Sequence, residues 1–493
     1  MKTFMEKRDM FENFNNTIKV YYTSDTHAHV VPNFLNVINN FKKEENTLII
    51  DGGDTIQGSP LSMYLSNIKD ASVFSKILNL AQYDYVTLGN HEFNYGKQYL
   101  DSFLGSLKAK LLCANISGFK AYDIKNVLGI KVGIVGLTTD FIPMWEREEH
   151  LEGLTFTDPF FCAKSILEEI KEKCDLTILI YHGGYEKDVF TGEVYSETKE
   201  NVGYKICDEL EYDLVLTAHQ HKPMEGAYIN GTYTVQPPHN ATSYIEIHIV
   251  FENGKPKFKS FLKTPEINLE ENPINIPDFL KEHIKNKDKL LNEQIGKLKA
   301  PLVQGDYLHM ALNGSELANF QNMVQLWATK ANHSSTGLPN KTSGLNEIVT
   351  LRDVFSTFIY PNNLIVLEMT YDIIKEVLER TAAYFHYEDN VISVEKSFLK
   401  PKIAHYDYDY YTFKYTIDIT KPIGNRVISI DVPEKFTLCL TNYRAGGSGG
   451  YTSYKKAKVV KEYTQYINEL IIEYFKSHEI IEVQKFPNVE VLK

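Results

Sequence analysis

The stretch LGNHEFN, residues 88–94, decides how the fold of this chain is interpreted. It follows a short apolar run, residues 85–88, that predicts a buried strand, and Gly96 then turns the chain. An amide beside an imidazole makes a poor core but a good place to hold a metal ion. Alone, a Gly-Asn-His loop is most often only a loop, so the interpretation depends on the other strands.

Four more strand-like apolar runs in the first half of the chain end in similar polar clusters. The runs and their clusters are 18–22 with Asp25 and His27, 47–50 with Asp54, 175–180 with His182, and 213–217 with His219 and His221. Helical patterns lie between them, including one predicted helix over residues 61–80. This alternation predicts an α/β domain, and ligands of such sheets lie outside the carboxyl ends of the strands.

Length, charge and cysteine content exclude several classes of protein. A chain of 493 residues predicts two or three domains. The net charge of −12 argues against a partner that is a nucleic-acid polymer. Five widely spaced cysteines predict reduced thiols rather than a disulfide framework. We expect no secretory signal, no membrane span and hence a cytoplasmic protein, and the sequence leaves the oligomeric state open.

The pattern changes in the second half of the chain. Residues 264–300 combine prolines with a Lys/Glu-rich helix, which predicts a linker between a first domain, 1–263, and a second domain, 301–493. The second domain is predicted to contain helices and strands, and its most unusual stretch is TNYRAGGSGGY, residues 441–451. The predicted helices are 316–330 and 370–385, and the predicted strands are 364–369, 411–419 and 436–441.

The polar clusters have bland interpretations when each is taken singly. Asp54 could form a turn, Asp25 could cap a helix, and His182 could be an ordinary hydrogen-bonded histidine. Taken together, the clusters supply imidazoles, carboxylates and one amide, enough for two metal ions that share a carboxylate. This mixed nitrogen and oxygen set suits Zn²⁺, Mn²⁺ or Fe²⁺. Two such ions are typical of hydrolases of phosphate esters.

The motifs DTHAH, GGDTIQGSP, GNHEFN, YHGG and AHQH resemble those of the calcineurin-like metallophosphoesterases. More narrowly, the chain resembles the bifunctional 5′-nucleotidase and 2′,3′-cyclic-nucleotide 2′-phosphodiesterase/3′-nucleotidase family. The resemblance implies an α/β fold with an N-terminal αββα sandwich and a C-terminal α/β nucleotidase domain. It also implies two metal ions: Asp25, His27 and His221 around one, Asn90, His182 and His219 around the other, and Asp54 between them.

The resemblance also assigns roles around the phosphate. His91 matches a histidine that contacts the phosphate, where it would stabilise the transition state or protonate the leaving alcohol. The 5′-nucleotidase branch usually has Asp where this chain has Asn94. Asn can hydrogen-bond the ring but cannot stabilise an imidazolium by charge. The Asn form resembles the cyclic phosphodiesterase/3′-nucleotidase branch.

In the second domain the resemblance implies a nucleoside pocket around the glycine-rich loop. Tyr443 is the expected stacking face for the base, and either Phe486 forms the opposite face or the base is held on one face only. The other predicted substrate contacts are Arg444, Gly446, Gly447, Tyr451 and Arg352. Each arginine could equally form a surface salt bridge.

These features predict an enzyme that hydrolyses 2′,3′-cyclic nucleotides to 3′-nucleotides and then to nucleoside and phosphate. The first alternative is a 5′-nucleotidase, acting on nucleoside monophosphates or nucleotide sugars, on the same scaffold. The second is a nucleotide-binding protein without catalysis, which the full ligand set argues against.

Overall fold

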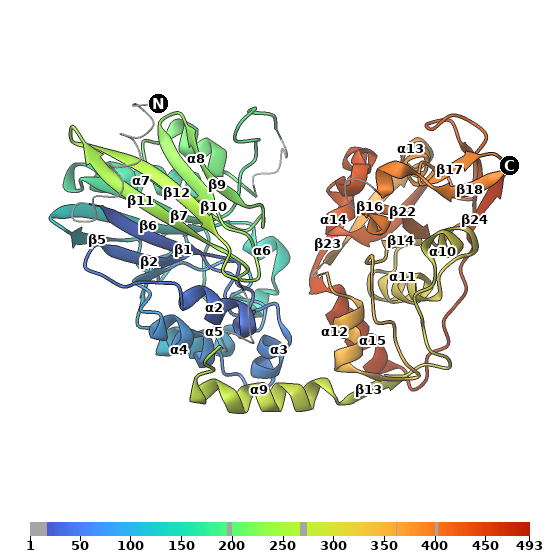
Figure 1. The fold of residues 1–493 in the computed structure, drawn as a ribbon, viewed down its shortest axis with the longest axis horizontal. Helices are drawn as coiled ribbons and strands as arrows, with labels where there is room; N and C mark the ends of the chain where they lie inside the picture. The colour runs from blue at the N-terminus through green and yellow to red at the C-terminus, as the bar shows by residue number, and fades with distance from the viewer. Residues whose placement is uncertain (1–16, 195–199, 267–273, 361, 400–402) are drawn as a thin grey trace. The chain divides into compact units, whose positions relative to one another are not determined.

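The computed structural model describes residues 17–194, 200–266, 274–360, 362–399 and 403–493 (Figure 1). Contacts between residues divide the chain into two compact units, Met1–Lys287 and Asp288–Lys493. Part of the predicted linker, residues 267–273, lies outside the described residues. The domain boundaries placed at 263 and 300 stay predictions.

Two six-stranded sheets form the centre of the first unit. The first sheet has the order β12 (Lys255–Lys263), β11 (Tyr244–Glu252), β1 (Ile18–Thr23), β2 (Thr47–Asp51), β3 (Tyr85–Val86), β4 (Lys110–Leu111). The second has the order β5 (Tyr122–Val127), β6 (Ile130–Thr138), β7 (Leu176–His182), β8 (Leu214–Thr217), β10 (Thr232–Gln236), β9 (Met224–Ile229). Strands β1 to β4 are parallel, and so are β6, β7, β8 and β10.

Three apolar layers show how the sheets and helices stack. On β2, Ile50 belongs to the cluster between the two sheets and Ile49 to the cluster on the outer face. This alternation follows from side chains that point to opposite faces of a strand. On β7, Ile180 faces the first sheet and Leu179 faces the other way in the same manner.

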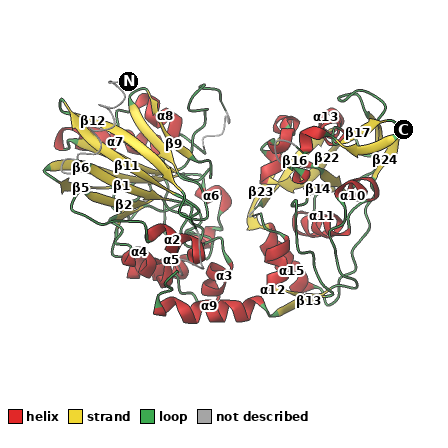
Figure 2. Ribbon diagram, viewed as in Figure 1, coloured by secondary structure: helices red, strands yellow, loops and turns green. Residues whose placement is uncertain are grey.

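Helices cover both outer faces (Figure 2). On the first sheet these are a π-helical turn (Val30–Phe34), α2 (Leu35–Ile38), α3 (Pro60–Asn67), α4 (Ser72–Leu80) and α5 (Lys97–Ser106). The second sheet is followed along the chain by α6 (Ile142–Trp145), α7 (Pro159–Ile170) and α8 (Gly203–Glu209), of which α7 and α8 pack on its outer face. The predicted αββα sandwich is therefore confirmed.

The helix predicted over residues 61–80 is wrong in one respect, because two helices occupy that stretch. Lys69 between them has φ of 54°, which no right-handed helix accommodates. Asp70 then accepts a hydrogen bond at 2.9 Å from the backbone N–H of Ser72, the first residue of the second helix.

Helix α9 (Asp278–Leu291) begins on the first unit. Leu280 is fully buried in the outer cluster of the first sheet. The Asn286 side chain donates to the hydroxyl of Tyr64 at 3.2 Å. These contacts explain why the first unit extends to Lys287, beyond the last strand of its sheets. Within the described residues, no helix is both long and apolar enough to span a bilayer.

A five-stranded sheet forms the centre of the second unit. Its order is β19 (Asp409–Tyr411), β14 (His333–Gly337), β22 (Lys435–Thr441), β16 (Asn363–Thr370), β23 (Lys458–Tyr466). The smaller sheets are β21 (Val427–Ile430), β20 (Tyr415–Asp418) and β24 (Val489–Leu492), then β13 (Gln294–Lys297) with β15 (Ile348–Thr350), and β17 (Phe385–Glu388) with β18 (Val391–Val394). The helices are α10 (Tyr307–Asn313), α11 (Glu316–Thr329), α12 (Leu351–Thr357), α13 (Tyr371–Ala382), α14 (Asn442–Ala445) and α15 (Ile467–Ser477).

The sequence pattern located most of these elements. Helices α11 and α13 and strands β16 and β22 lie within a few residues of their predicted ranges. The single strand predicted over residues 411–419 is wrong. The chain instead leaves β19, which pairs with β14, and enters β20, which pairs with β21 and β24. One apolar run therefore serves two sheets.

Candidate metal centre

The polar clusters lie where parallel strands end. Asp25 and His27 follow β1, Asp54 follows β2, and Asn90 follows β3. His182 is the last residue of β7, and His219 and His221 follow β8. Because the strands within each sheet run parallel here, these ends gather at one edge of the sandwich.

Three groups of donor atoms suited to a metal ion result. They are Asp25, His27 and His221; His27, Asp54 and His91; and Asp54, His182 and His219. Within each group the donor atoms lie within 4.8 Å of one another. Asp54 and His27 each belong to two groups, and of the two only Asp54 has a carboxylate with two oxygens that could bridge two ions. The structure thus brings together six of the seven predicted ligands, with His91 beside them.

Three buried polar atoms test whether a cation fits. Asp54 Oδ2, Asn90 Oδ1 and His182 Nε2 have no hydrogen-bond partner within the described residues. His182 Nδ1 donates to the carbonyl of Gly52 at 2.6 Å, so Nε2 is left to face Asp54 Oδ2 at 3.1 Å. Unsatisfied buried groups are rare in native proteins, and a bound ion is one explanation. The seventh predicted ligand, Asn90, supplies one of these atoms.

The other end of the centre also brings imidazole nitrogens and a carboxylate oxygen close together. His27 Nδ1 donates to the carbonyl of Gln57 at 3.1 Å, which leaves its Nε2 as an acceptor. That Nε2 lies 2.9 Å from His221 Nε2, and Asp25 Oδ1 lies 3.4 Å from the same atom of His221. Burial and the neighbouring imidazole of His221 hold the pKa of His27 well below its usual range. A neutral imidazole is the form that binds a metal ion, so the donor set fits.

Glu92 ties two of the ligand loops together. Its carboxylate accepts hydrogen bonds from the backbone N–H groups of Asp54, Thr55, Ile56 and Gly89 at 2.6 to 3.3 Å. Burial, with the Asp54 carboxylate adding to it, raises the pKa of Glu92 to about 7. A β-carbon at Gly89 would lie 2.1 Å from Asp54 Oδ1, so only glycine allows the loop to approach Asp54 this closely.

Glu200 and Asn201 support the ligands of the second sheet. Glu200 Oε1 lies 2.8 Å from His219 Nε2. Asn201 Oδ1 accepts from the backbone N–H of Gly184 at 2.6 Å, in the loop that follows His182. A carboxylate on the far nitrogen of a ligating histidine fixes its tautomer and orientation. His219 is then left with Nδ1 for a metal ion.

His91 lies at the edge of the donor cluster. Its backbone N–H donates to Asp54 Oδ1 at 2.8 Å, and its ring Nδ1 lies 2.6 Å from Asn94 Oδ1. Its Nε2 faces the cluster, 3.9 Å from Asp54 Oδ2. Burial lowers the pKa of His91, although Asp54 and Asn94 oppose this effect. The ring thus contributes Nε2 to one of the three donor groups, and its role toward the phosphate rather than a metal ion stays a prediction.

The glycine-rich loop of the second unit follows β22. Tyr443 in α14 is 41% exposed, whereas Arg444 is 3% and Tyr451 1% exposed. The Tyr451 hydroxyl donates to the carbonyl of Asp407 at 2.9 Å. The structure therefore places Arg444 and Tyr451 beneath the loop, as supports, and Tyr443 on its surface. Gly446 and Gly447 form the turn between them, and Gly447 has φ of 82°.

Arg352 and Phe486 lie elsewhere in the second unit. Arg352 contacts Asn292 Oδ1 at 3.0 Å and Asp288 at 3.7 Å, and within the described residues none of its hydrogen bonds or ion pairs reaches the Tyr443 loop. Phe486 is half-buried in an extended segment before β24. Substrate contacts by these residues stay predictions.

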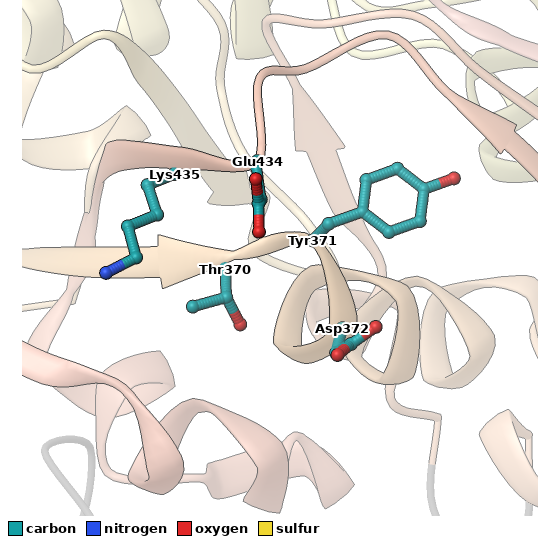
Figure 3. A pocket seen from close by; sticks show the side chains of 5 residues that line it. All are labelled: Thr370, Tyr371, Asp372, Glu434 and Lys435. Carbon is teal, nitrogen blue, oxygen red and sulfur yellow. The ribbon is translucent and has the colours of Figure 1, made fainter.

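A surface depression of the second unit lies where β16 passes into α13 (Figure 3). Its lining side chains are Thr370, Tyr371, Asp372, Glu434 and Lys435. None of the predicted site residues belongs to it, and it holds none of the donor groups described above. We assign it no function.

Glu92, Glu200 and Asn201 were missed in the sequence analysis. Glu92 stands inside the GNHEF motif, and a carboxylate next to the predicted ligand Asn90 and the predicted phosphate contact His91 was an available signal. Glu200 and Asn201 follow a polar stretch and carry no local pattern. Only the folded structure shows that Glu200 contacts His219 and that Asn201 contacts Gly184.

Comparisons with known proteins agree with this geometry. Residues 18–223 match the calcineurin-like phosphoesterase family, and residues 294–456 match the 5′-nucleotidase C-terminal domain. The first range contains every predicted metal ligand, and the second contains the Tyr443 loop.

Individual relatives span both units. A 2′,3′-cyclic-nucleotide 2′-phosphodiesterase/3′-nucleotidase of Haemophilus influenzae is 26% identical over 82% of this chain and 74% of its own length. The trifunctional nucleotide phosphoesterase of Bacillus subtilis is 23% identical over 88% of this chain, which spans only 35% of that longer protein. A Staphylococcus aureus structure assigned as a 5′-nucleotidase aligns with a TM-score of 0.71 and 29% identity, covering 97% of this chain and all of that one.

The chain belongs to the calcineurin-like phosphoesterases and carries a C-terminal domain of the 5′-nucleotidase type. It is a hydrolase of phosphoric esters within the nucleotidase and phosphodiesterase family. Calcineurin-like phosphoesterases use a dimetal centre, and the His/Asp groups at the strand ends are the candidates for it here.

Proposed function

We propose that this enzyme hydrolyses 2′,3′-cyclic nucleotides to 3′-nucleotides and then releases phosphate from the 3′-nucleotides. The observation that carries the catalytic part is the convergence of seven donor residues, of which Asp54 and His182, like the neighbouring Asn90, hold a buried polar atom without a hydrogen-bond partner in the described residues. The observation that favours the cyclic substrate is Asn94, which contacts His91 where the 5′-nucleotidase branch has an acid. The Haemophilus influenzae relative, named for the same two activities, supports this choice.

The proposed centre holds two divalent ions, Mn²⁺, Zn²⁺ or Fe²⁺, in the ligand groups that the sequence suggested. Such ions supply Lewis acidity toward phosphate oxygens and activate the attacking water. The absence of cysteine from the donor groups is consistent with these metals rather than with a structural zinc site.

His91 handles the proton and the charge on the leaving side. Nδ1 of His91 is hydrogen-bonded to Asn94. Nε2 is therefore the ring nitrogen expected to contact the phosphate. The acid is the imidazolium form of His91, with protons on both ring nitrogens: as water adds to phosphorus and the bond to the 2′ oxygen breaks, the Nε2 proton passes to that oxygen, and the proton lost by the attacking water restores Nε2. The same transfer to the 3′ oxygen completes the second reaction. His91→Ala is expected to lower turnover strongly while leaving metal content near normal.

The nucleobase is proposed to stack on Tyr443. Tyr443 is 41% exposed as a residue and its hydroxyl lies 3.4 Å from Asp407 Oδ1, so the side chain is held at its end yet remains accessible to a ligand. Stacking of a base on an aromatic ring contributes about 1–3 kcal/mol and tolerates different bases.

The test is release of phosphate and nucleoside from 2′,3′-cyclic AMP, 3′-AMP and 5′-AMP, with Mn²⁺ and with EDTA. Metal-dependent attack on the first two supports the proposal. Attack on 5′-AMP alone would favour the 5′-nucleotidase alternative, to which the Staphylococcus aureus structure also points. If the protein bound nucleotides but turned over none of the three, the alternative of a nucleotide-binding protein without catalysis would be favoured.

A further inference from the structure

Glu146 lies directly behind Asn94, on the side away from His91. Asn94 Oδ1 contacts His91 Nδ1 at 2.6 Å, and Asn94 Nδ2 donates to Glu146 Oε2 at 2.7 Å. Glu146 follows helix α6, 52 residues further along the chain, and its side chain is only 5% exposed. An imidazole, an amide and a carboxylate thus form one hydrogen-bonded row.

The carboxylate decides which way the amide faces. A carboxylate only accepts hydrogen bonds, so the NH₂ group of Asn94 must point to Glu146 and its oxygen to His91. That oxygen in turn holds a proton on Nδ1 of His91. The remaining ring nitrogen, Nε2, is the one that faces the donor cluster. The tautomer of His91 is therefore set by a carboxylate that does not touch the ring.

Glu146 is itself fixed. Its Oε1 accepts from the backbone N–H of Arg147 at 2.8 Å and lies 2.8 Å from His150 Nδ1. The His150 ring packs over Gly96, where a β-carbon would come within 3.1 Å of it. The loop that carries His91 and the segment that carries Glu146 thus interlock on both sides of the contact.

We propose that Glu146 is a positioning residue for His91, acting through Asn94; this rests on the proposed role of His91 in phosphate ester hydrolysis. Hydrogen bonds to a charged group are about twice as strong as neutral ones, and bonds in a row strengthen one another. Glu146 polarises the Asn94 amide, and the negative end of the amide stabilises the charged ring. In a direct Asp–His pair the carboxylate contacts the ring. Here the side chain of Asn94 lies between the Glu146 carboxylate and the ring of His91.

A double-mutant cycle separates this role from a purely structural one. In E146Q the carboxylate is lost, and kcat is expected to fall about 10- to 100-fold with little change in KM. In N94D two carboxylates face each other at hydrogen-bond distance, and a similar loss is expected. In N94D/E146Q the glutamine amide donates to the carboxylate introduced at position 94, which now contacts His91 directly. The double variant is expected to recover at least about tenfold over E146Q.

The matched control is E149Q, in the same segment, where the side chain is 73% exposed and the rate should stay unchanged. Metal content and melting temperature are measured for all variants. A double variant no faster than E146Q would overturn the proposal, because recovery requires that the two residues act on the same group.

A second readout does not depend on turnover. In metal-free protein labelled with ¹⁵N at histidine and held at pH 8.5, ring correlations report which nitrogen of His91 carries the proton, with His91→Ala for assignment. In the neutral ring the proton is expected on Nδ1, and a neutral ring that carries its proton on Nε2 instead would overturn the proposal. The cycle is also run on phenyl phosphate, which has no nucleoside. If the proposed nucleotide substrates were wrong, the rates on phenyl phosphate would still be measurable. Failure of the proposed substrate and failure of the proposed role of Glu146 can therefore be told apart.

Discussion

Replacing Arg444 by Met tests whether the glycine-rich loop rests on a buried charge network. Arg444 Nε and Nη2 lie 3.0 and 2.9 Å from Asp409 Oδ1, and Nη1 lies 3.3 Å from Asp407 Oδ1. The backbone carbonyls of Ser448 and Tyr406 each accept from it at 2.8 Å. The guanidinium is therefore fully occupied by protein acceptors, in a place where it is 3% exposed.

The magnitude follows from burial. Asp409 is 1% exposed, so the substitution leaves a buried carboxylate without its cation. Removing one partner of a buried pair costs about 3–5 kcal/mol. For a unit of about 200 residues each kcal/mol shifts the melting temperature by roughly 2–4 °C. R444M is thus expected to lower the melting temperature of the second unit by roughly 6–20 °C.

The loss should also depend on pH. Burial raises the pKa of Asp409 even though Arg444 opposes the shift, and without Arg444 it should rise further. Between the unfolded and the folded pKa of Asp409, the folded protein then binds more protons than the unfolded one. Stability of R444M relative to wild type therefore falls as pH rises through that window. We expect the difference in melting temperature to be larger at about pH 8 than at about pH 5.

The assay is differential scanning calorimetry of the full chain. The predicted metal ligands lie in the first unit, so the transition whose temperature does not change when Mn²⁺ is added is assigned to the second unit. R352M is the matched control, because Arg352 is 49% exposed at its side chain and surface pairs contribute about 0–1 kcal/mol. A shift in R444M no larger than in R352M, or one that grows at low pH, would refute the reasoning.

Three further outcomes are expected. Glu200→Gln should weaken Mn²⁺ binding about 10- to 100-fold in calorimetric titration, because Glu200 orients His219 at 2.8 Å; unchanged affinity would make that contact incidental. Tyr443→Ala should raise KM for nucleotides about 5- to 150-fold but not KM for phenyl phosphate, and equal effects would argue against stacking. Burial raises the pKa of Asp123, but hydrogen bonds from neighbours such as Lys110 outweigh it and lower the pKa to about 2. Wild type should therefore lose stability in urea as pH falls from about 4 to 2, and an Asp123→Asn variant should lack that component; identical pH profiles would contradict this origin.

The sequence predicted the metal centre because its signal repeats. Asp54 or His182 alone could be an ordinary turn or core residue. Several such clusters, each directly after an apolar run, have a joint explanation in the geometry of parallel strands. The folded structure brings these side chains together and adds the distances, such as 3.1 Å between His182 Nε2 and Asp54 Oδ2, while their role as metal ligands stays a prediction.

The carboxylates around the centre could not be predicted in this way. Glu146 begins a charged run directly after Trp145, Glu200 lies in a polar stretch, and no motif marks either residue. Their contacts, at 2.7 Å to Asn94 and 2.8 Å to His219, arise from loops whose paths the hydrophobic pattern does not determine. The sequence argument that Asn94 deprives His91 of charge was therefore incomplete, because the charge lies one contact further away.

The backbone at the ligands shows why the centre is formed by the fold itself. Five of the predicted ligands have positive φ, between 47° and 70°: Asp25, His27, Asp54, His219 and His221. Residues with side chains adopt this region at a cost of order 1–3 kcal/mol each. The cost is borne because hydrogen bonds such as those from the Asp25 and His27 N–H groups to the carbonyls of Gly53 and Asp54, both 2.9 Å, hold the loops in place. Glycine would remove the strain but also the ligand, so stability is given up at these positions for a set of donors that is oriented before any metal ion binds.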